Sequence, residues 1–577
     1  MKMRNAFSGK RFSILLVVGF AIVLALPMLL YGPLIDGHDT HEHLNYVKHF
    51  SEQFWTGNLY PRWLMGMNAG LGSPTFFVFP PLPAYVSVML EPAARVLHFD
   101  AFNFAAFLAL AISGITSFLW LRTLVSEKIA TICALLYMLM PYHLAIDFYR
   151  RCALPECWAM AWMPLVLYFA QNIVRGKRRS EIGLAFAFAL MIISHLISVA
   201  MFFPIPIILA ILLSDKGRRF SAALRVVAAM AAGTGLASFY LLSAVANAKF
   251  ISASKITVVF KWSENLVSLG KGLFIHAGAE NFVQTISWTV VTMIIVTLVC
   301  GIGLLKWATR DAKPVIFFWM VMVCGGSIFC MSRASAPIWR HVHKLAEAIQ
   351  FPWRFNGILC LGVVWLLALF FSNLSRIPRT PMIVSISALI LVFGGWMVAY
   401  GSVWHRYKVD VWRPPHDERH LINDSDGWFY AWLPEGTVQS STLAAGAGPK
   451  ARFKDGQGAA RITLWAPRDL ELEANSSSGG WVMVNQFYYP TWEGKLRGTP
   501  GSLEVRAAMP EGLLEVHVPA GLQNVQIQIP PSWEERFGQW ISAASLVICL
   551  MAFFRKERES RSLQNAVPAL SAGATAI

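Results

Sequence analysis

Charged residues are scarce in this chain. Asp, Glu, Lys and Arg account for 14% of its 577 residues, whereas 56% of the residues are hydrophobic. Soluble globular domains carry about 25% charged residues, so a chain of this composition cannot cover its surface with polar groups. The shortage of charge excludes an ordinary soluble enzyme and indicates an integral membrane protein, as does the mean hydropathy of +0.50.

Acidic residues are fewer than basic ones, which leaves a formal net charge of +16. A large positive charge can indicate a nucleic-acid partner, but surplus Lys and Arg residues of membrane proteins lie in cytoplasmic loops beside anionic lipid. Because the hydrophobic runs place the chain in a membrane, we expect the lipid bilayer as the partner of these charges and no nucleic acid.

Cysteine is too rare to build a disulfide framework. Most of the eight cysteines lie inside apolar runs, where a small buried thiol is the usual explanation. Cys152 and Cys157 fall in an expected outer loop, where a bridge could form, although two unpaired thiols are favoured. The sequence also lacks internal repeats of about 20 to 50 residues, the signature of solenoids and propellers.

Apolar runs are frequent enough to cross a bilayer about twelve times. They lie at 11–31, 101–124, 129–143, 157–174, 181–195, 197–213, 220–244, 286–305, 314–331, 355–373, 381–402 and 535–554. The two runs within 181–213 are short for a bilayer of ~30 Å and could form one tilted helix or a re-entrant pair. The first run has basic residues before it but no small-residue cleavage pattern, so we expect an uncleaved helix.

The basic clusters fall on one side of the membrane if the chain crosses at every apolar run, as the positive-inside rule requires. They lie at 2–11, 122–128, 175–179, 216–219, 306–313, 376–379 and 555–558. Both termini are therefore expected in the cytoplasm, the second as a tail at 555–577.

The opposite side receives the larger connecting segments of a transmembrane domain at 1–402. These segments are 32–100, 144–156, 245–285 and 332–354. In 403–533, β-rich runs such as LELEA, WVMVNQFYY and VQIQI alternate with Gly, Pro, Asn and Ser clusters. The predicted fold is an all-α polytopic membrane domain with a C-terminal extracytoplasmic β-sandwich-like domain, anchored by a last helix at 534–554.

The first outer segment opens with DGHDTHEH at 36–43, directly after the first helix. Asp39 would lie at the lipid–water boundary, where a carboxylate can accept a proton, and is the first catalytic candidate. A divalent metal ion could be held by His38, Asp39, His41 and His43. For His41 and Glu42, a polar helix start with solvated side chains is the alternative.

The second segment reads HLAIDFYRRCALPE at 143–156 and concentrates charge between two apolar helices. Charges so close to lipid are costly unless they pair or bind something. One interpretation is a structural pair, either Asp147–Arg151 or Arg150–Glu156. The other is a cationic pocket for a phosphate, in which Asp147, Arg150 and Arg151 bind substrate and Glu156 is a second catalytic carboxylate.

Three further polar residues are candidates because they lie in apolar surroundings. QFPWR at 350–354 places Arg354 at the mouth of a helix, as an interfacial anchor or as a phosphate ligand. The stretch 58–90 is too irregular for a transmembrane helix and is expected along the interface, where Arg62 either snorkels or contacts substrate. His195, between two short helices, is better explained as a packing histidine than as a catalyst.

Several of these motifs occur together, and in order, in one bacterial membrane family. They are GHD-x-x-x-H at 37–43, YPRW and G-x-G-x-P at 60–74, R-x-A-x-x-E at 151–156, SHL at 194–196 and QFPWR at 350–354. Over residues 30–375 the chain resembles the 6-pyruvoyl-tetrahydropterin synthase-related membrane proteins. NQFYYPTWEGKL, with Val-Pro-Ala-Gly at 518–521, looks like the β domain of related large membrane proteins. No soluble pterin-synthase pattern is present, so the name implies no such activity.

The layout is also similar to that of the GT-C glycosyltransferases, in which Asp39 would match the acidic residue of the first outer loop. That resemblance implies a multi-pass enzyme of the bacterial inner membrane, which transfers a sugar from a polyprenyl-phosphate donor to a glycan, lipid or protein acceptor outside the cytoplasm. The chain departs from the pattern, since it has no WWDYG-like acceptor motif and its first loop is rich in His. His38, His43 and Arg62 join Asp147, Arg150, Arg151 and Arg354 as the expected substrate-binding residues.

Two other function classes fit the same features. Polar groups near helix ends also line the pathways of transporters and lipid-carrier flippases, although no inverted repeat is detected and the candidate groups gather on one face. A non-catalytic assembly protein whose β domain binds an envelope polymer is the third.

Overall fold

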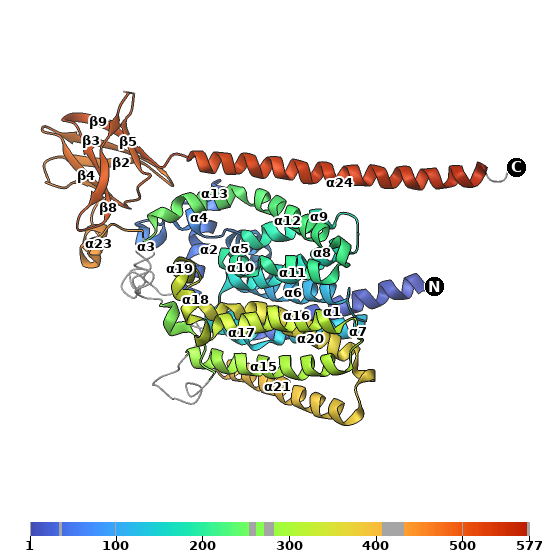
Figure 1. The fold of residues 1–577 in the computed structure, drawn as a ribbon. Coiled ribbons are helices and arrows are strands. Elements are labelled where there is room, and N and C mark those ends of the chain that lie inside the picture. The colour runs from blue at the N-terminus through green and yellow to red at the C-terminus, as the bar shows by residue number, and fades with distance from the viewer. Residues whose placement is uncertain are drawn as a thin grey trace.

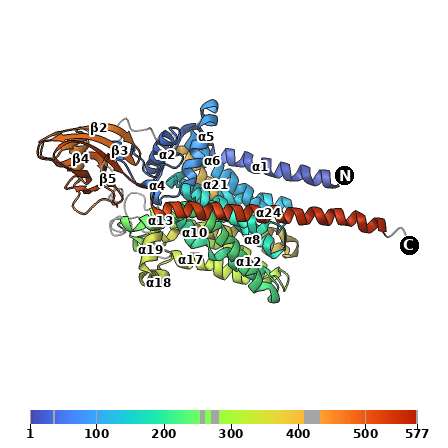
Figure 2. The same cartoon turned by 90° about the horizontal axis from the view of Figure 1, so that it is seen from above.

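The computed structural model describes residues 2–33, 37–98, 100–252, 261–269, 282–406, 432–498 and 500–573. A helical bundle lies beside a β domain, and both chain ends lie at the end of the bundle remote from that domain (Figures 1 and 2). We call the opposite end the β-domain end. The long last helix, α24 (Trp533–Gly573), runs back along the bundle from the β domain.

The bundle has the polytopic character that the sequence predicts. Ten helices in the described ranges are long and apolar enough to cross a membrane, or eleven if one bent pair is counted. They comprise α1 (Lys2–Tyr31), α6 (Ala101–Leu121), α7 (Glu127–Leu139) with η1 (Tyr142–Arg151), α8 (Leu154–Val174), α10 (Leu196–Phe202) with α11 (Pro204–Leu213), α15 (Phe282–Trp307), α16 (Lys313–Trp319) with η6 (Met320–Gly325) and α17 (Gly326–Met331), η8 (Pro352–Phe355) with α20 (Asn356–Ser372), α21 (Arg379–Arg406), and α24. The expected span at 181–195 is shorter, since α9 (Ser180–Ile192) has 13 residues.

The expected span at 220–244 is broken. Its two halves, α12 (Arg219–Leu236) and α13 (Ser238–Asn247), belong to a pair that bends by 75°. Ser542 of α24 meets the break, where its hydroxyl accepts from the Phe239 amide at 2.8 Å and donates to the Gly235 carbonyl at 3.2 Å. A break inside a membrane needs such partners because lipid offers none, so the last helix stabilises the bend.

The described part of the first outer segment forms four helices. It contains α2 (Thr40–Phe54), two short helices, α3 (Met67–Gly70) and α4 (Thr75–Val78), and α5 (Leu82–Leu97). None of these four helices is among those long and apolar enough to cross a membrane, in keeping with the prediction for 58–90. Pro83 lies in the first turn of α5, where a missing amide hydrogen costs no helical hydrogen bond, so the proline starts a helix there.

The β domain is a sandwich of two antiparallel sheets, as predicted. One sheet has the order β1-β4-β8-β7 and the other β2-β3-β9-β5-β6. The strands are β1 (Ala451–Phe453), β2 (Ala459–Ala466), β3 (Asp469–Ser476), β4 (Gly480–Phe487), β5 (Glu493–Leu496), β6 (Ser502–Leu503), β7 (Val505–Ala508), β8 (Leu513–Val518) and β9 (Gly521–Gln528). Trp63, Leu71 and Phe77 of the first outer segment share its hydrophobic core. Burial of these side chains joins the domain to the bundle.

Candidate functional site

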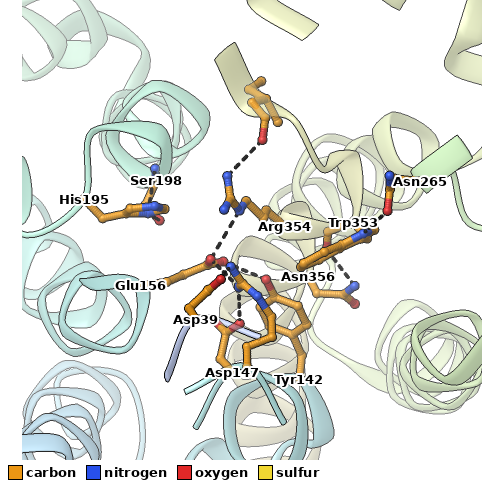
Figure 3. A network of polar contacts seen from close by, with 12 residues as sticks. Asp39, Tyr142, Asp147, Glu156, His195, Ser198, Asn265, Trp353, Arg354 and Asn356 are labelled. Atoms are coloured by element: carbon orange, nitrogen blue, oxygen red, sulfur yellow. Dashed lines mark hydrogen bonds and ion pairs between the residues drawn. The ribbon is translucent and has the colours of Figure 1, made fainter. Parts of the chain in front are cut away.

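Arg151 is the centre of a buried charge network. Its partner Asp39 directly precedes α2, which lies at the β-domain end of the bundle (Figures 1 and 2), and Figure 3 shows Asp39, Asp147 and Glu156 together. The Arg151 guanidinium donates to the carboxylates of Asp147 and Glu156, each at 2.6 Å, and to Asp39 at 3.0 Å. Trp353 lies beside it, with the guanidinium carbon 5.0 Å from the ring centroid. Three carboxylates around one guanidinium use the planar fork of arginine, which an ammonium group cannot reproduce.

Glu156 extends the network to a second arginine. Its Oε2 atom contacts Arg151 at 2.6 Å and the Nε atom of Arg354 at 3.4 Å, while its Oε1 atom accepts from the Tyr142 hydroxyl at 2.6 Å. Arg354 also donates to the Ile349 carbonyl at 3.0 Å. Both oxygens of Glu156 are therefore occupied, and its clearest role is to hold the two arginines in place.

The local fold explains how residues distant in sequence meet. η1 ends at Arg151, and the positive φ of 57° at the next residue, Cys152, turns the chain toward α8. At this turn the Asp39 amide donates to the Arg151 carbonyl at 2.9 Å. Arg354 enters from η8, the tight turn before α20. The network thus combines the first outer segment, η1, α8 and η8, and each group is fixed by backbone geometry as well as by charge.

The three carboxylates differ in how far they are exposed to solvent. The side chains of Asp147 and Glu156 are 0% and 3% exposed, whereas that of Asp39 is 35% exposed. Burial raises the pKa of Asp39, but the nearby positive charge, above all that of Arg151, brings this pKa below the usual carboxyl value. Among the three, Asp39 is thus the ionised carboxylate that an incoming molecule can reach.

The two histidines expected to bind substrate flank Asp39. The His38 ring packs against Phe282 at a centroid distance of 4.5 Å, and the His43 ring lies 5.7 Å from that of Phe79. Burial lowers the pKa of His43 to about 4, so this imidazole is neutral at neutral pH. Within the described ranges, no group of three or more His, Cys, Asp or Glu side chains is arranged to hold a metal ion. The described residues therefore provide no set of ligands for the metal site predicted at 38–43.

Arg62 lies in a different cluster, at the junction with the β domain. It pairs with Glu535 of α24 at 3.1 Å and donates to the Phe239 carbonyl at 2.8 Å. Arg468, between β2 and β3, binds the same carboxylate at 3.1 Å. These partners belong to the joint between the domains, so Arg62 is placed as a structural residue and its expected contact with substrate is not supported by the geometry.

The other sequence hypotheses have clear outcomes. The Asp147–Arg151 pair forms, whereas Glu156 binds Arg151 and Arg354 in place of the suggested Arg150 partner. The Arg150 carbonyl accepts from the His38 amide at 3.3 Å. Cys152 and Cys157 are buried free thiols, which confirms the unpaired alternative, and Cys157 belongs to α8 instead of the loop.

Tyr142 is the site residue that sequence reasoning missed. An aromatic residue after a proline at a helix end looks like an interfacial anchor, and nothing local shows that its hydroxyl reaches Glu156 14 residues later. The signal that could have found it is the spacing along η1. A π-helix brings different residues onto one face than the 3.6-residue period assumes, and such helices often occur at functional sites.

The fold and the site together define a polytopic membrane protein with a buried ionic network at the end that carries a C-terminal β domain. The family model of a membrane protein with a 6-pyruvoyl-tetrahydropterin synthase related domain matches residues 76–400. The chain belongs to this family. No curated protein matches the sequence.

Two kinds of solved structure are similar in architecture. The Archaeoglobus fulgidus oligosaccharyltransferase in its apo form shares 13% identity over 72% of this chain, with a TM-score of 0.38. The same enzyme with a tethered acceptor peptide shares 14% identity over 73% of this chain, with a TM-score of 0.37. This chain spans 57% and 59% of those two chains. ArnT from Cupriavidus metallidurans shares 14% identity over 62% of this chain and 77% of its own, with a TM-score of 0.29.

Proposed function

We propose that this protein is a membrane glycosyltransferase of the bacterial inner membrane. It would transfer a sugar from a polyprenyl-phosphate donor to a cell-envelope acceptor on the extracytoplasmic side, where the β domain would lie. The observation that carries the proposal is the pairing of Asp39, a reachable carboxylate, with Arg151, a buried guanidinium 3.0 Å away.

The reaction needs a base and a group that stabilises a leaving phosphate. The acceptor hydroxyl oxygen attacks the anomeric carbon, its proton passes to Asp39, and the bond between the anomeric carbon and the phosphate oxygen breaks with both electrons on the phosphate. In this scheme Arg151 and Arg354 stabilise that negative charge. A low-dielectric setting strengthens this effect, because fewer water molecules screen the charges.

The buried carboxylates have a different task in this scheme. Asp147 and Glu156 are almost fully buried and hold the guanidinium of Arg151, and Glu156 also holds Arg354. Arginines fixed in this way need little rearrangement when phosphate charge develops, which is the requirement for electrostatic catalysis. Asp39 is then the carboxylate that gives up its contact with Arg151 when donor and acceptor enter.

The test is deletion of the gene, followed by mass spectrometry of envelope glycans and lipid-linked sugars. Loss of one envelope sugar with build-up of its polyprenyl-linked donor on the outer leaflet is the expected result. Build-up on the cytoplasmic leaflet would indicate a flippase, and an unchanged glycan and lipid profile would contradict both activities. Complementation with the Asp39→Asn variant separates a catalytic role from a scaffolding one.

A further inference from the structure

His195 faces the charge network from a break in the membrane helices. It is the N-cap residue of α10, with an extended backbone at φ −161° and ψ 102°. The break is held by other elements: the Ile193 carbonyl accepts from the Leu82 amide at 2.9 Å, and the Ser194 hydroxyl accepts from the Trp162 indole at 3.1 Å. Contacts from two other elements therefore fix the position of the imidazole.

The hydrogen bonds of His195 define its tautomer. Its Nδ1 atom accepts from the Ser198 backbone amide at 3.3 Å and lies 2.8 Å from the Ser198 hydroxyl. A backbone amide can only donate, so Nδ1 carries no proton, and the proton of the neutral ring is on Nε2. Capping of α10 thus leaves His195 with one N–H donor at the opposite edge of the ring.

That donor is available. Among the residues that the structure describes, Nε2 has no hydrogen-bond partner, and the side chain is only half-buried. The charges of Glu156 and Arg354 act on the imidazole, and Figure 3 shows His195 opposite Arg354, with Glu156 between and below them. Both oxygens of Glu156 are already held by Tyr142, Arg151 and Arg354, so the carboxylate has little capacity left for His195.

We infer that His195 is a further substrate-contacting residue, whose Nε2–H donates to an anionic phosphate oxygen held between it and Arg354. This assignment rests on the proposed function, because it takes the phosphate to be that of the lipid-linked donor. A neutral donor suits the position. A second cation beside Arg354 would repel that guanidinium and cost desolvation, whereas a neutral N–H adds a hydrogen bond without a charge.

Two substitutions of His195 distinguish its capping of α10 from hydrogen-bond donation by its Nε2 atom. In His195→Asn the amide oxygen can take the place of Nδ1 and cap α10, as Asn does well, but no donor reaches the position of Nε2. In His195→Gln the amide nitrogen can take the place of Nε2 while the cap is lost. A purely structural histidine therefore predicts that Asn is the better replacement, and a phosphate-binding histidine predicts that Gln is.

The experiment measures binding of polyprenyl monophosphate to the purified full-length protein in nanodiscs, together with the thermal midpoint of each variant. We expect His195→Asn to be stable and to lose about tenfold or more in affinity, the loss typical of a hydrogen bond to a charged group. His195→Gln should keep most of the affinity with a lower midpoint. Binding by the Asn variant equal to or tighter than that of the Gln variant would overturn the assignment.

The same measurement distinguishes failure of this inference from failure of the proposed function, because binding needs no sugar transfer. If the wild-type protein binds the lipid phosphate with the expected order of variants but transfers no sugar, the function is wrong and the His195 assignment stands. If the wild-type protein transfers sugar and the order is reversed, His195 is only a helix cap. A wild-type protein that binds no lipid phosphate contradicts the assignment directly.

Discussion

The indole of Trp63 donates to the side-chain oxygen of Gln486 at 2.8 Å, across 423 residues of sequence. The amide of Gln486 donates in turn to the Gly70 carbonyl at 2.6 Å, and the Phe487 amide to the Leu71 carbonyl at 2.6 Å. β4 is thus hydrogen-bonded to the same outer segment that carries Asp39. The β domain and the candidate site are parts of one packed unit, so a change at their joint can reach the site.

The joint depends on Glu535, which is shared by Arg62 and Arg468. We expect Glu535→Gln to destabilise the protein by about 3 kcal/mol or more, because it leaves two arginines of the joint without their carboxylate. Glu535 and Arg62 are nearly fully buried, with side chains 5% and 3% exposed, and Arg468 is 17% exposed. The readout is the thermal unfolding midpoint, combined with limited proteolysis between the bundle and the β domain.

The matched control is Glu534→Gln, the same change one residue earlier. Glu534 is half-buried and has no ion pair among the residues that the structure describes. Its midpoint should stay close to that of the wild type. Equal effects of the two substitutions would show that the Arg62–Glu535–Arg468 cluster contributes nothing specific to the joint.

The sequence predicts those contacts that lie within one turn or one strand. The pair Asp147–Arg151 is separated by four residues on a helical segment, so spacing suggests it, and alternation along LELEA suggests β3. Glu535 could not be predicted as the partner of Arg62. The pair joins residues 473 positions apart, and its formation depends on how a separate domain packs on the first segment.

The role that we propose for His195 could not be predicted from the sequence, for the same reason. Sequence shows a polar residue between two short apolar runs, which is most often a packed histidine. The role of this histidine depends on which ring nitrogen caps α10 and on which residues lie near the ring, and both depend on the tertiary structure. The charged residues of the network could be proposed as candidates from the sequence, because a charge near lipid is informative without knowledge of its partner.

Sidedness of the β domain can be tested by thiol labelling. Ser477→Cys is suitable because Ser477 is exposed, whereas Ser476 is buried. In spheroplasts we expect an impermeant maleimide to label Ser477→Cys at once and Arg178→Cys, in an exposed turn between α8 and α9, only after permeabilisation. The wild-type protein gives the background, since its cysteines are buried except for the half-buried Cys330. The reverse pattern would invert the proposed orientation.

Stability should depend on pH through His43. Burial lowers the pKa of this imidazole from 6.5 to about 4, so the unfolded chain binds a proton more readily than the folded one. The contribution of the neutral His43 imidazole to the free energy of unfolding is therefore fully present above pH 6.5 and is lost as pH falls to about 4. The loss amounts to about 3 kcal/mol. His43→Asn should flatten the dependence of the unfolding midpoint over this window, while His98→Asn, at an exposed histidine, should leave it unchanged.

Asp39→Asn should reduce sugar transfer by about 10²- to 10⁴-fold, because it removes the proton acceptor. The protein should remain folded, since the Asp39 side chain is 35% exposed and Asn can still accept from Arg151. The pKa of Asp39 lies below the usual carboxyl value, so its ionisation leaves the rate unchanged above pH of about 4. Glu91→Gln, in the same segment but paired with Arg95, is the control. Transfer near the wild-type rate would remove Asp39 from the mechanism.

The last prediction concerns Arg151 and Arg354, each replaced by Lys and by Ala. If the arginines stabilise the leaving phosphate, the Ala variants should lose about 10²-fold or more in kcat, because the interaction strengthens as charge develops in the transition state. Lys should restore only part of the loss, since an ammonium group provides a point charge without the planar fork that grips two oxygens.

The two positions should differ in how the protein tolerates the change. Arg151 pairs with three carboxylates, so Arg151→Ala leaves Asp147 and Glu156 buried without this partner and should lower the unfolding midpoint as well as the rate. Arg354 shares a single carboxylate, at 3.4 Å, so Arg354→Ala should affect the rate more than the midpoint. An interfacial anchor would behave otherwise, because Lys would snorkel as well as Arg and keep nearly full activity. Equal transfer rates for Arg, Lys and Ala would exclude both residues as phosphate ligands.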